Sequence, residues 1–379
     1  MDTVVVDLTR DLVRAESPTG REAPAAEVLV RALRDLGYDD VRVDAAGNVI
    51  GELQRGEGPT LMLNGHIDTV PAGDPDAWPH PPFAGVLEDG FVYGRGACDM
   101  KGPVAAMAVG ARRAADDGVS GRIVVTGVVQ EEIGGLGARY LARTQRADMV
   151  IVGEPSNLQL MLGHRGRCEV RVAFGGRLAH AGRAELGENA LARAARFVTA
   201  LEGLALPSVA RVGRASATPT SLVTWPKDGT NVVPGAAELV VDYRMTPGES
   251  RQAVLERLQS LDAEAVLHVP EEPFQSQDGA VTMTLPRENP PYLLDEDHPL
   301  VPVARRALTA ALGTSVEVGT WWFATDAPHL SVMGAPIIGF GPGDPALAHT
   351  SEERVPVSQL HAAVAGYRSL IGACLAGRA

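Results

Sequence analysis

Residues 1 to about 163 alternate two patterns of apolar positions. Segments in which apolar residues recur at helical spacing predict helices near 3–16, 22–36, 101–117 and 135–144. Short, continuous apolar runs predict buried strands near 41–52, 60–65, 122–129 and 149–153. Alternation of helices with such strands is typical of an α/β sheet flanked by helices. We therefore expect a sheet of this kind in the first part of the chain.

The pattern changes near His164. The spacing beyond it predicts a series of short elements: a strand at 167–174, a helix near 188–204, strands near 221–225 and 237–244, a helix near 249–260 and a strand near 264–269. This β-α-β-β-α-β order is that of a ferredoxin-like domain. After about residue 285 the α/β pattern returns. We expect a catalytic domain of residues 1–164 and 286–379, and an inserted domain of residues 165–285, since 379 residues suit two domains.

Polar residues follow several of the apolar runs, and in open α/β sheets sites form beyond the carboxyl ends of the strands. The residues in such places are His66, Glu131, Glu132, Glu154 and, through a glycine-rich loop, His349. Asp99 lies in the glycine-rich stretch 94–102. Because the carboxyl ends of these strands lie at the same edge of the sheet, we expect these side chains to form one site.

Five of these residues have the chemistry of a metal centre. The two imidazoles and three carboxylates suit two divalent ions, and they belong to His66, Asp99, Glu132, Glu154 and His349. Glu131 is left over as a candidate general base. Each residue alone has a simpler explanation: a structural histidine, a solvated acidic loop, or a helix N-cap at Asp99. Those explanations would have to hold at every strand end at once, so the sequence favours a two-metal hydrolase.

Two segments are specific enough to indicate a family. Gly-His-Ile-Asp-Thr-Val-Pro at 65–71 and Gly-Arg-Gly-Ala-Cys-Asp-Met-Lys-Gly at 94–102 resemble the metallopeptidase superfamily of aminoacylases, acetylornithine deacetylases, succinyl-diaminopimelate desuccinylases and glutamate carboxypeptidases. The resemblance covers essentially the whole chain. It implies a catalytic α/β sheet domain of the di-zinc exopeptidase type, with an inserted ferredoxin-like domain that pairs two subunits and closes over the active site.

The resemblance also implies roles for the ligands. Asp99 would bridge two ions, most simply zinc, with cobalt or manganese as substitutes. His66 and Glu154 would complete one metal site, and Glu132 and His349 the other. The bond after the bridging Asp99 would be cis.

Other residues acquire roles from the same resemblance. Asp68 would hold the second ring nitrogen of His66. His180, in Ala-His-Ala-Gly, would reach the active site of the partner subunit in a homodimer. Asn231 and Arg244 would meet the substrate carboxylate. Two simpler alternatives stay open: His180 as an ordinary loop histidine, and Arg244 as a surface residue in an ion pair.

The implied reaction is hydrolysis of an N-acyl-amino acid. A metal-bridging water would be deprotonated by Glu131, which would then protonate the leaving amine, while His180 would stabilise the oxyanion. The segments 339–344 and 348–353 look most like the acetylornithine deacetylase branch, which acts in arginine biosynthesis. No arginine stands at 319–326 to meet a succinyl group, which favours a small acyl group.

Three alternatives to a deacetylase remain. A dipeptidase or carboxypeptidase would use the same metals on a peptide bond, and a desuccinylase would use them on a succinyl amide. A non-catalytic metal-binding scaffold is the third, although no ligand or base is missing. The aromatic residues Trp321, Trp322 and Phe323 could belong either to the pocket or to the core.

Composition narrows the choice of partners. The formal net charge of −13 argues against nucleic acid and against an anionic membrane surface. No apolar stretch approaches the ~20 residues of a membrane span, and the start lacks the basic region of a signal peptide. We expect a cytoplasmic enzyme. The three scattered cysteines, Cys98, Cys168 and Cys374, predict small buried side chains and no disulfide framework.

Overall fold

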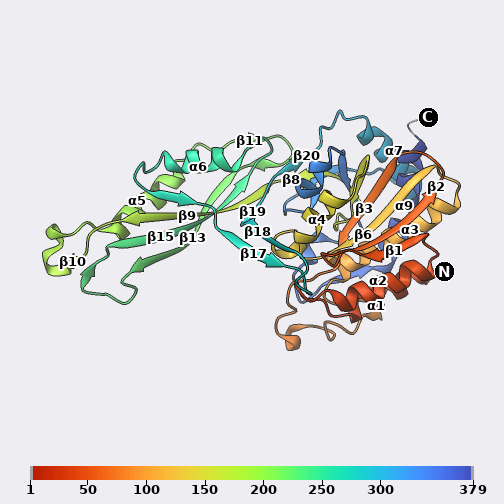
Figure 1. The fold of residues 1–379 in the computed structure, drawn as a ribbon, viewed down its shortest axis with the longest axis horizontal. Coiled ribbons are helices and arrows are strands. Elements are labelled where there is room, and N and C mark those ends of the chain that lie inside the picture. Colours follow the sequence, from red (N-terminus) through yellow and green to blue (C-terminus); the bar gives the residue numbers. More distant parts are fainter. Residues whose placement is uncertain (1–2, 377–379) are drawn as a thin grey trace.

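The computed structural model describes residues 3–376, and in Figure 1 they form a larger unit with a smaller one extending from its side. The larger unit is built on a sheet of nine strands in the order β1-β2-β6-β3-β7-β22-β8-β20, with β21 beside β8. Its strands are β1 (Asp40–Val43), β2 (Val49–Arg55), β3 (Thr60–His66), β6 (Gly121–Val128), β7 (Met149–Val152), β8 (Leu160–His164), β20 (Tyr292–Leu293), β21 (Val318–Trp321) and β22 (Ile337–Gly339). The central strands β6, β3, β7 and β22 are parallel.

Helices cover both faces of this sheet, as its continuous apolar runs predict. They are α1 (Val4–Arg14), α2 (Ala23–Asp35), α3 (Gly102–Asp116), α4 (Leu136–Thr144), α7 (Leu300–Leu312), α8 (Ala327–Leu330) and α9 (Val357–Ala376). Leu63 and Val125 of the sheet pack in one core with α1, α3, α7 and α9. Met62 and Val124, their neighbours in sequence, pack on the other side with α4 and α8.

One predicted strand is wrong in its extent. The single strand expected at 41–52 is two strands, β1 and β2, joined by a tight turn. The Asp44 side chain makes this turn, because its Oδ1 accepts hydrogen bonds from the backbone of Ala46 and Asn48. Gly47 there has a φ of 97°, which suits glycine.

The smaller unit has the predicted ferredoxin-like arrangement. Its elements are β9 (Gly166–Gly175), α5 (Ala190–Glu202), β13 (Ser216–Trp225), β15 (Ala236–Met245), α6 (Arg251–Gln259) and β16 (Val266–His268). The strands are antiparallel in the order β13-β15-β9-β16, and β19 (Glu288–Asn289) also pairs with β9. β15 alternates buried and half-buried residues, so one face of the sheet packs with both helices in a core of its own.

A hairpin of β17 (Glu271–Gln275) and β18 (Thr282–Pro286) lies between the two units. It falls within the range 165–285 that we expected for the inserted domain. Its buried residues Val281, Met283 and Leu285 nevertheless belong to the core of the larger unit. The hairpin is therefore packed as part of the larger unit, although it follows the smaller one in sequence.

Short elements complete the fold. They are β4 (Val86–Glu88), β5 (Phe91–Tyr93), β10 (Ala179–His180), β11 (Ser208–Val209), β12 (Gly213–Arg214), β14 (Val232–Val233), β23 (Arg354–Pro356) and the short helical segments η1 (Pro75–Ala77), η2 (Ala97–Lys101), η3 (Glu131–Ile133), η4 (Ala181–Leu186), η5 (Ser331–Met333) and η6 (Pro345–Leu347). All three cysteines are buried and unpaired, as predicted. Between residues 3 and 376 no helix combines the length and apolar character that crossing a membrane requires.

Candidate active site

The ends of the parallel strands carry the predicted metal ligands. His66 is the last residue of β3, and Glu154 follows β7 by two residues. Glu132 lies in η3, just after β6. His349 lies in the loop that follows β22. The sheet order places β6, β3, β7 and β22 side by side, so their carboxyl ends meet at one edge, as expected.

The first group of ligands is His66, Asp99 and Glu154. Their ligand atoms all lie within 4.8 Å of one another, and all three residues are buried. His66 Nε2 is 3.0 Å from Asp99 Oδ1 and 3.8 Å from Glu154 Oε1. A single ion could contact all three.

The second group shares Asp99 with the first. His349 Nε2 is 3.3 Å from Asp99 Oδ2 and 3.0 Å from Glu132 Oε1. The two oxygens of Asp99 therefore face different groups, which is the arrangement of a bridging carboxylate. Over residues 3–376 these two groups are the ones that bring three potential metal ligands together. The split of the five residues is the one implied by the family resemblance.

The electrostatics of the cluster fit positive ions. Burial raises the pKa of Glu154 well above its usual range, and the negative charge of Asp99 adds to the effect. Although burial opposes it, hydrogen bonds to His349 and His66 hold the pKa of Asp99 below its usual range. Buried carboxylates that repel one another are stabilised when cations lie between them. The mixed imidazole and carboxylate donors suit zinc-type ions.

Asp68 connects the first group to the loop that carries Glu131. Its backbone oxygen lies 3.0 Å from Nδ1 of His66, and its Oδ1 lies 3.4 Å from the same atom. Its carboxylate also accepts hydrogen bonds from the backbone N–H groups of Glu131 and Glu132, at 3.2 and 3.3 Å. Asp68 therefore fixes the ring of one ligand and the position of another. The position of Asp68 is consistent with its predicted role.

The bond between Asp99 and Met100 is cis, as predicted. The backbone there is held by Glu353, whose Oε1 accepts hydrogen bonds from the N–H groups of Cys98 and Asp99 at 3.1 and 3.0 Å. Glu353 itself is fully buried and paired with Arg95. We did not predict this carboxylate. Its one signal in the sequence is its position four residues after His349.

Glu131 belongs to neither ligand group. Burial raises the pKa of Glu131 well above its usual range, and the charge of Asp326 raises it further. Asp326 is also buried, with a pKa raised by burial to about 7. Its Oδ2 accepts a hydrogen bond from Asn64 at 3.3 Å. Asp326 was noted in the sequence only as part of the segment 319–326.

The remaining predicted residues divide into two sets. His180 is in β10, which pairs with β14 at the end of the smaller unit that points away from the large sheet (Figure 1). It is exposed, and its Nδ1 accepts a hydrogen bond from Gly182 N. Asn231 is beside it, because its carbonyl accepts a hydrogen bond from Ala181. Within one chain, then, His180 and Asn231 do not join the ligand cluster.

Arg244, in contrast, reaches the cluster. It lines a cavity of about 280 Å³ whose walls also include Glu131, Glu132 and His349. The structure describes Trp321, Trp322 and Phe323, and none of the three lines this cavity. Trp321 is buried and donates a hydrogen bond to Pro155 O, whereas Trp322 is 64% exposed.

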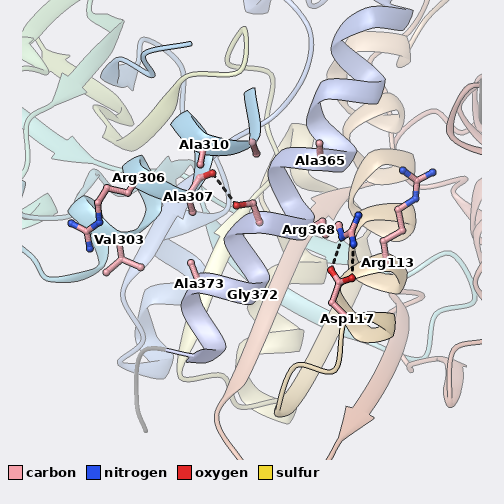
Figure 2. Close-up of a pocket in the computed structure, with 12 residues that line it drawn as sticks. Arg113, Asp117, Val303, Arg306, Ala307, Ala310, Ala365, Arg368, Gly372 and Ala373 are labelled. Atoms are coloured by element: carbon pink, nitrogen blue, oxygen red, sulfur yellow. Dashed lines mark hydrogen bonds and ion pairs between the residues drawn. The ribbon is translucent and has the colours of Figure 1, made fainter. Parts of the chain in front are cut away.

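A second cavity, of about 780 Å³, has a different character. Figure 2 shows it between α7, α9 and the end of α3, lined by alanines and by charged residues. Its clearest polar feature is the ion pair of Arg368 with Asp117, whose side chains face each other. No residue of either ligand group lines it. The cavity beside the ligand cluster is therefore the candidate active site.

Comparisons with known proteins agree with this geometry. The sequence model of the peptidase family M20/M25/M40 matches residues 62–373. A succinyl-diaminopimelate desuccinylase of Halorhodospira halophila is 30% identical over 398 residues, which cover 99% of each chain. A proposed LysW-lysine/LysW-ornithine hydrolase of Pyrobaculum aerophilum is 31% identical over 364 residues, which cover 95% of this chain and 94% of that protein.

The fold has counterparts among solved structures. The YXEP protein of Bacillus subtilis, described as a dinuclear metal-binding peptidase of family M20, matches with a TM-score of 0.73 at 17% identity. The match covers 98% of each chain. The likeness therefore includes both the larger and the smaller unit.

Proposed function

This chain belongs to the peptidase family M20/M25/M40, and we propose that it removes the acyl group of an N-acyl-amino acid. The predicted family and fold class are confirmed, and the protein is a metallohydrolase that acts on amide bonds. The observation that carries the finer proposal is the pair of ligand groups that share Asp99, beside a cavity that Arg244 lines.

Two ions fit the donors of this chain. His66 and Glu154 would hold one, Glu132 and His349 the other, and Asp99 would lie between them. Zinc is the simplest choice for this donor set, with cobalt or manganese as substitutes. When bound, the ions lower the pKa of a water molecule and polarise the carbonyl of the substrate.

Glu131 handles the proton in this proposal. It takes a proton from the attacking water and delivers it to the nitrogen of the leaving amine. Its place in the cavity wall, outside both ligand groups, supports this role. Asp68 is a positioning residue, because it holds the backbone of Glu131 and the ring of His66.

Arg244 binds the free carboxylate next to the scissile amide. A guanidinium and a carboxylate form paired, charge-assisted hydrogen bonds. Arg244 Nε already donates to Asp242 Oδ1 at 2.7 Å, which fixes its side chain. The substrate is thereby oriented with its carboxylate away from Glu131 and Glu132.

His180 and Asn231 act from a second copy of the chain. Their distance from the cluster within one chain supports this arrangement. The edge strand β13 exposes Leu222 and Trp225, which is consistent with an interface in a homodimer. In the dimer, His180 donates a hydrogen bond to the oxygen of the reacting carbonyl.

Peptide-bond hydrolysis is the second candidate, since a matching fold is that of a peptidase. A panel of N-acetylated amino acids, N-succinylated amino acids, dipeptides and tripeptides, each assayed with zinc, cobalt or manganese, separates the two. We expect the N-acyl-amino acids to be hydrolysed fastest. Faster hydrolysis of the peptides would contradict the proposal while leaving the family assignment intact. Acetylornithine deacetylation and a cytoplasmic location stay predictions.

A further inference from the structure

Three arginines form one wall of the active-site cavity. Arg244 was expected there, but Arg167 and Arg287 line the same cavity of about 280 Å³. Glu131, Glu132, Glu288 and His349 line it too, and Glu288 is paired with Arg251. We infer that Arg167 and Arg287 bind a second carboxylate of the substrate, in addition to the one that Arg244 binds. This inference rests on the proposed function and names its substrate class, a dicarboxylic N-acyl-amino acid.

Sheet pairing places two of the arginines together. Arg167 of β9 is directly opposite Arg244 of β15 in the antiparallel register. Both are held by Asp242: Arg167 Nε donates to its Oδ2 and Arg244 Nε to its Oδ1, each at 2.7 Å. Arg244 Nη2 also donates to Asp242 Oδ2, at a longer 3.5 Å. The short contacts are thus made by the inner nitrogens, and the terminal nitrogens are better placed for a ligand. Asp242 thus sets two guanidinium groups side by side.

Arg287 reaches the same wall from another part of the chain. It lies between β18 and β19, and its backbone oxygen accepts a hydrogen bond from Glu169 N at 3.0 Å. Its Nη2 donates to Glu272 at 2.7 Å. The Glu169 carboxylate lies 3.6 Å from Arg167 and 4.0 Å from Arg287. These two distances exceed a hydrogen bond, so Glu169 leaves both guanidinium groups able to bind a carboxylate.

The charges that line the cavity decide which substrate fits. One carboxylate occupies one guanidinium group in a paired contact, so three guanidinium groups exceed what a single α-carboxylate needs. Glu131 and Glu132 repel a second carboxylate and the arginines attract it, while the charge of Glu288 is paired with Arg251. The same arginines repel an ammonium group such as that of ornithine. The structure therefore favours an acidic substrate over acetylornithine.

Matched ligands can test this on the metal-loaded protein. N-acetyl-glutamate and N-acetyl-glutamine have the same shape and differ in one charge, and N-acetylornithine carries the opposite charge. N-succinyl-alanine and N-butanoyl-alanine place the second carboxylate on the acyl side instead. Dissociation constants would be measured by calorimetry in the Glu131→Gln background, so that ligand is not consumed. We expect the dianion of at least one pair to bind about tenfold or more tightly than its monoanionic partner.

Variants then show which residues cause the preference for the dianionic ligand. Arg167→Gln with Arg287→Gln should remove most of it, while binding of the monoanionic ligands changes little. Arg171→Gln is the matched control, since Arg171 is on the same strand and equally exposed but pairs with Glu238 outside the cavity. Equal binding within both pairs, or a preference that survives in the double variant, would overturn the inference.

The outcome is separable from that of the proposed function. Hydrolysis of the same ligands is measured with the wild-type protein. A charge preference that depends on the arginines, without hydrolysis of any N-acyl-amino acid, would reject the proposed reaction and retain the carboxylate site. Hydrolysis without any charge preference would retain the proposed reaction and reject the carboxylate site.

Discussion

The ligand cluster and the end of the smaller unit that carries His180 differ in whether one chain is enough to assemble them. Within one chain the cluster brings together two groups of three ligands that share Asp99, and the residues of the first group are all buried. His180 is exposed, and its Nδ1 accepts a hydrogen bond from Gly182 N in its own loop. The difference indicates that one chain can assemble the metal centre by itself. A second chain is needed if His180 is to take part in the reaction.

The largest effect is expected for a substitution of Glu131 beside the ligand cluster. Glu131→Gln should lower kcat by about 10³-fold or more, because both proton transfers lose their carrier. The variant should keep its full metal content, since Glu131 belongs to neither ligand group. Turnover measured together with elemental analysis checks both. Glu57→Gln, at an exposed glutamate, is the control, and near-normal turnover of the Glu131 variant would rule out its role as the base.

Metal content distinguishes the two regions directly. His66→Ala should lower the metal content of the purified, metal-loaded protein from two ions per chain to one or none, because a first-group ligand is lost. His180→Ala should retain both ions while losing activity. Elemental analysis of the two variants in parallel gives the answer. Two ions in the His66 variant would break the assignment of that group.

The role of a second chain can be tested by mixing two inactive variants. In a heterodimer of Glu131→Gln with His180→Ala, one of the two sites combines an intact Glu131 with an intact His180. Activity should therefore return to about a quarter of the wild-type value after subunit exchange. Mixing Glu131→Gln with wild type controls for dilution. Exchange without recovery, or an active monomer, would show that His180 does not act across an interface.

The metal ligands could be predicted from the sequence because each of them has a local sequence signal. An apolar run ends just before His66 and Glu154, and parallel strands must bring such ends together. The turn at Asp44 was missed although its signal is local, because Asp44, Gly47 and Asn48 are turn-forming residues between two short apolar runs. Glu353 and Arg167 could not be predicted in the same way. Their roles depend on contacts between distant segments, such as the pairing of β9 with β15, which fixes Arg167 opposite Arg244.

The smallest predicted effect concerns His164, the last residue of β8 before the chain enters the smaller unit. Burial lowers the pKa of His164 to about 4 from 6.5. Its Nε2 lies 3.2 Å from the N–H of Thr325, which suits a neutral ring. The unfolded chain binds a proton here at higher pH than the folded protein does. The resulting stability is thus fully present above about pH 6.5 and is lost as the pH falls toward 4.

The expected loss over that range is about 3 kcal/mol in the free energy of unfolding. Urea unfolding of the metal-free protein at several pH values between 7.5 and 4.5 measures it. Because the ligand carboxylates titrate in wild type and variant alike, the difference between the two isolates the contribution of His164. His164→Gln should have a shallower dependence on pH, whereas His268→Gln, at an exposed strand position, should follow the wild type. If the free energy of unfolding falls with pH equally in wild type and His164→Gln, protonation of His164 does not weaken the fold. The packing between the larger and the smaller unit would then be insensitive to this charge.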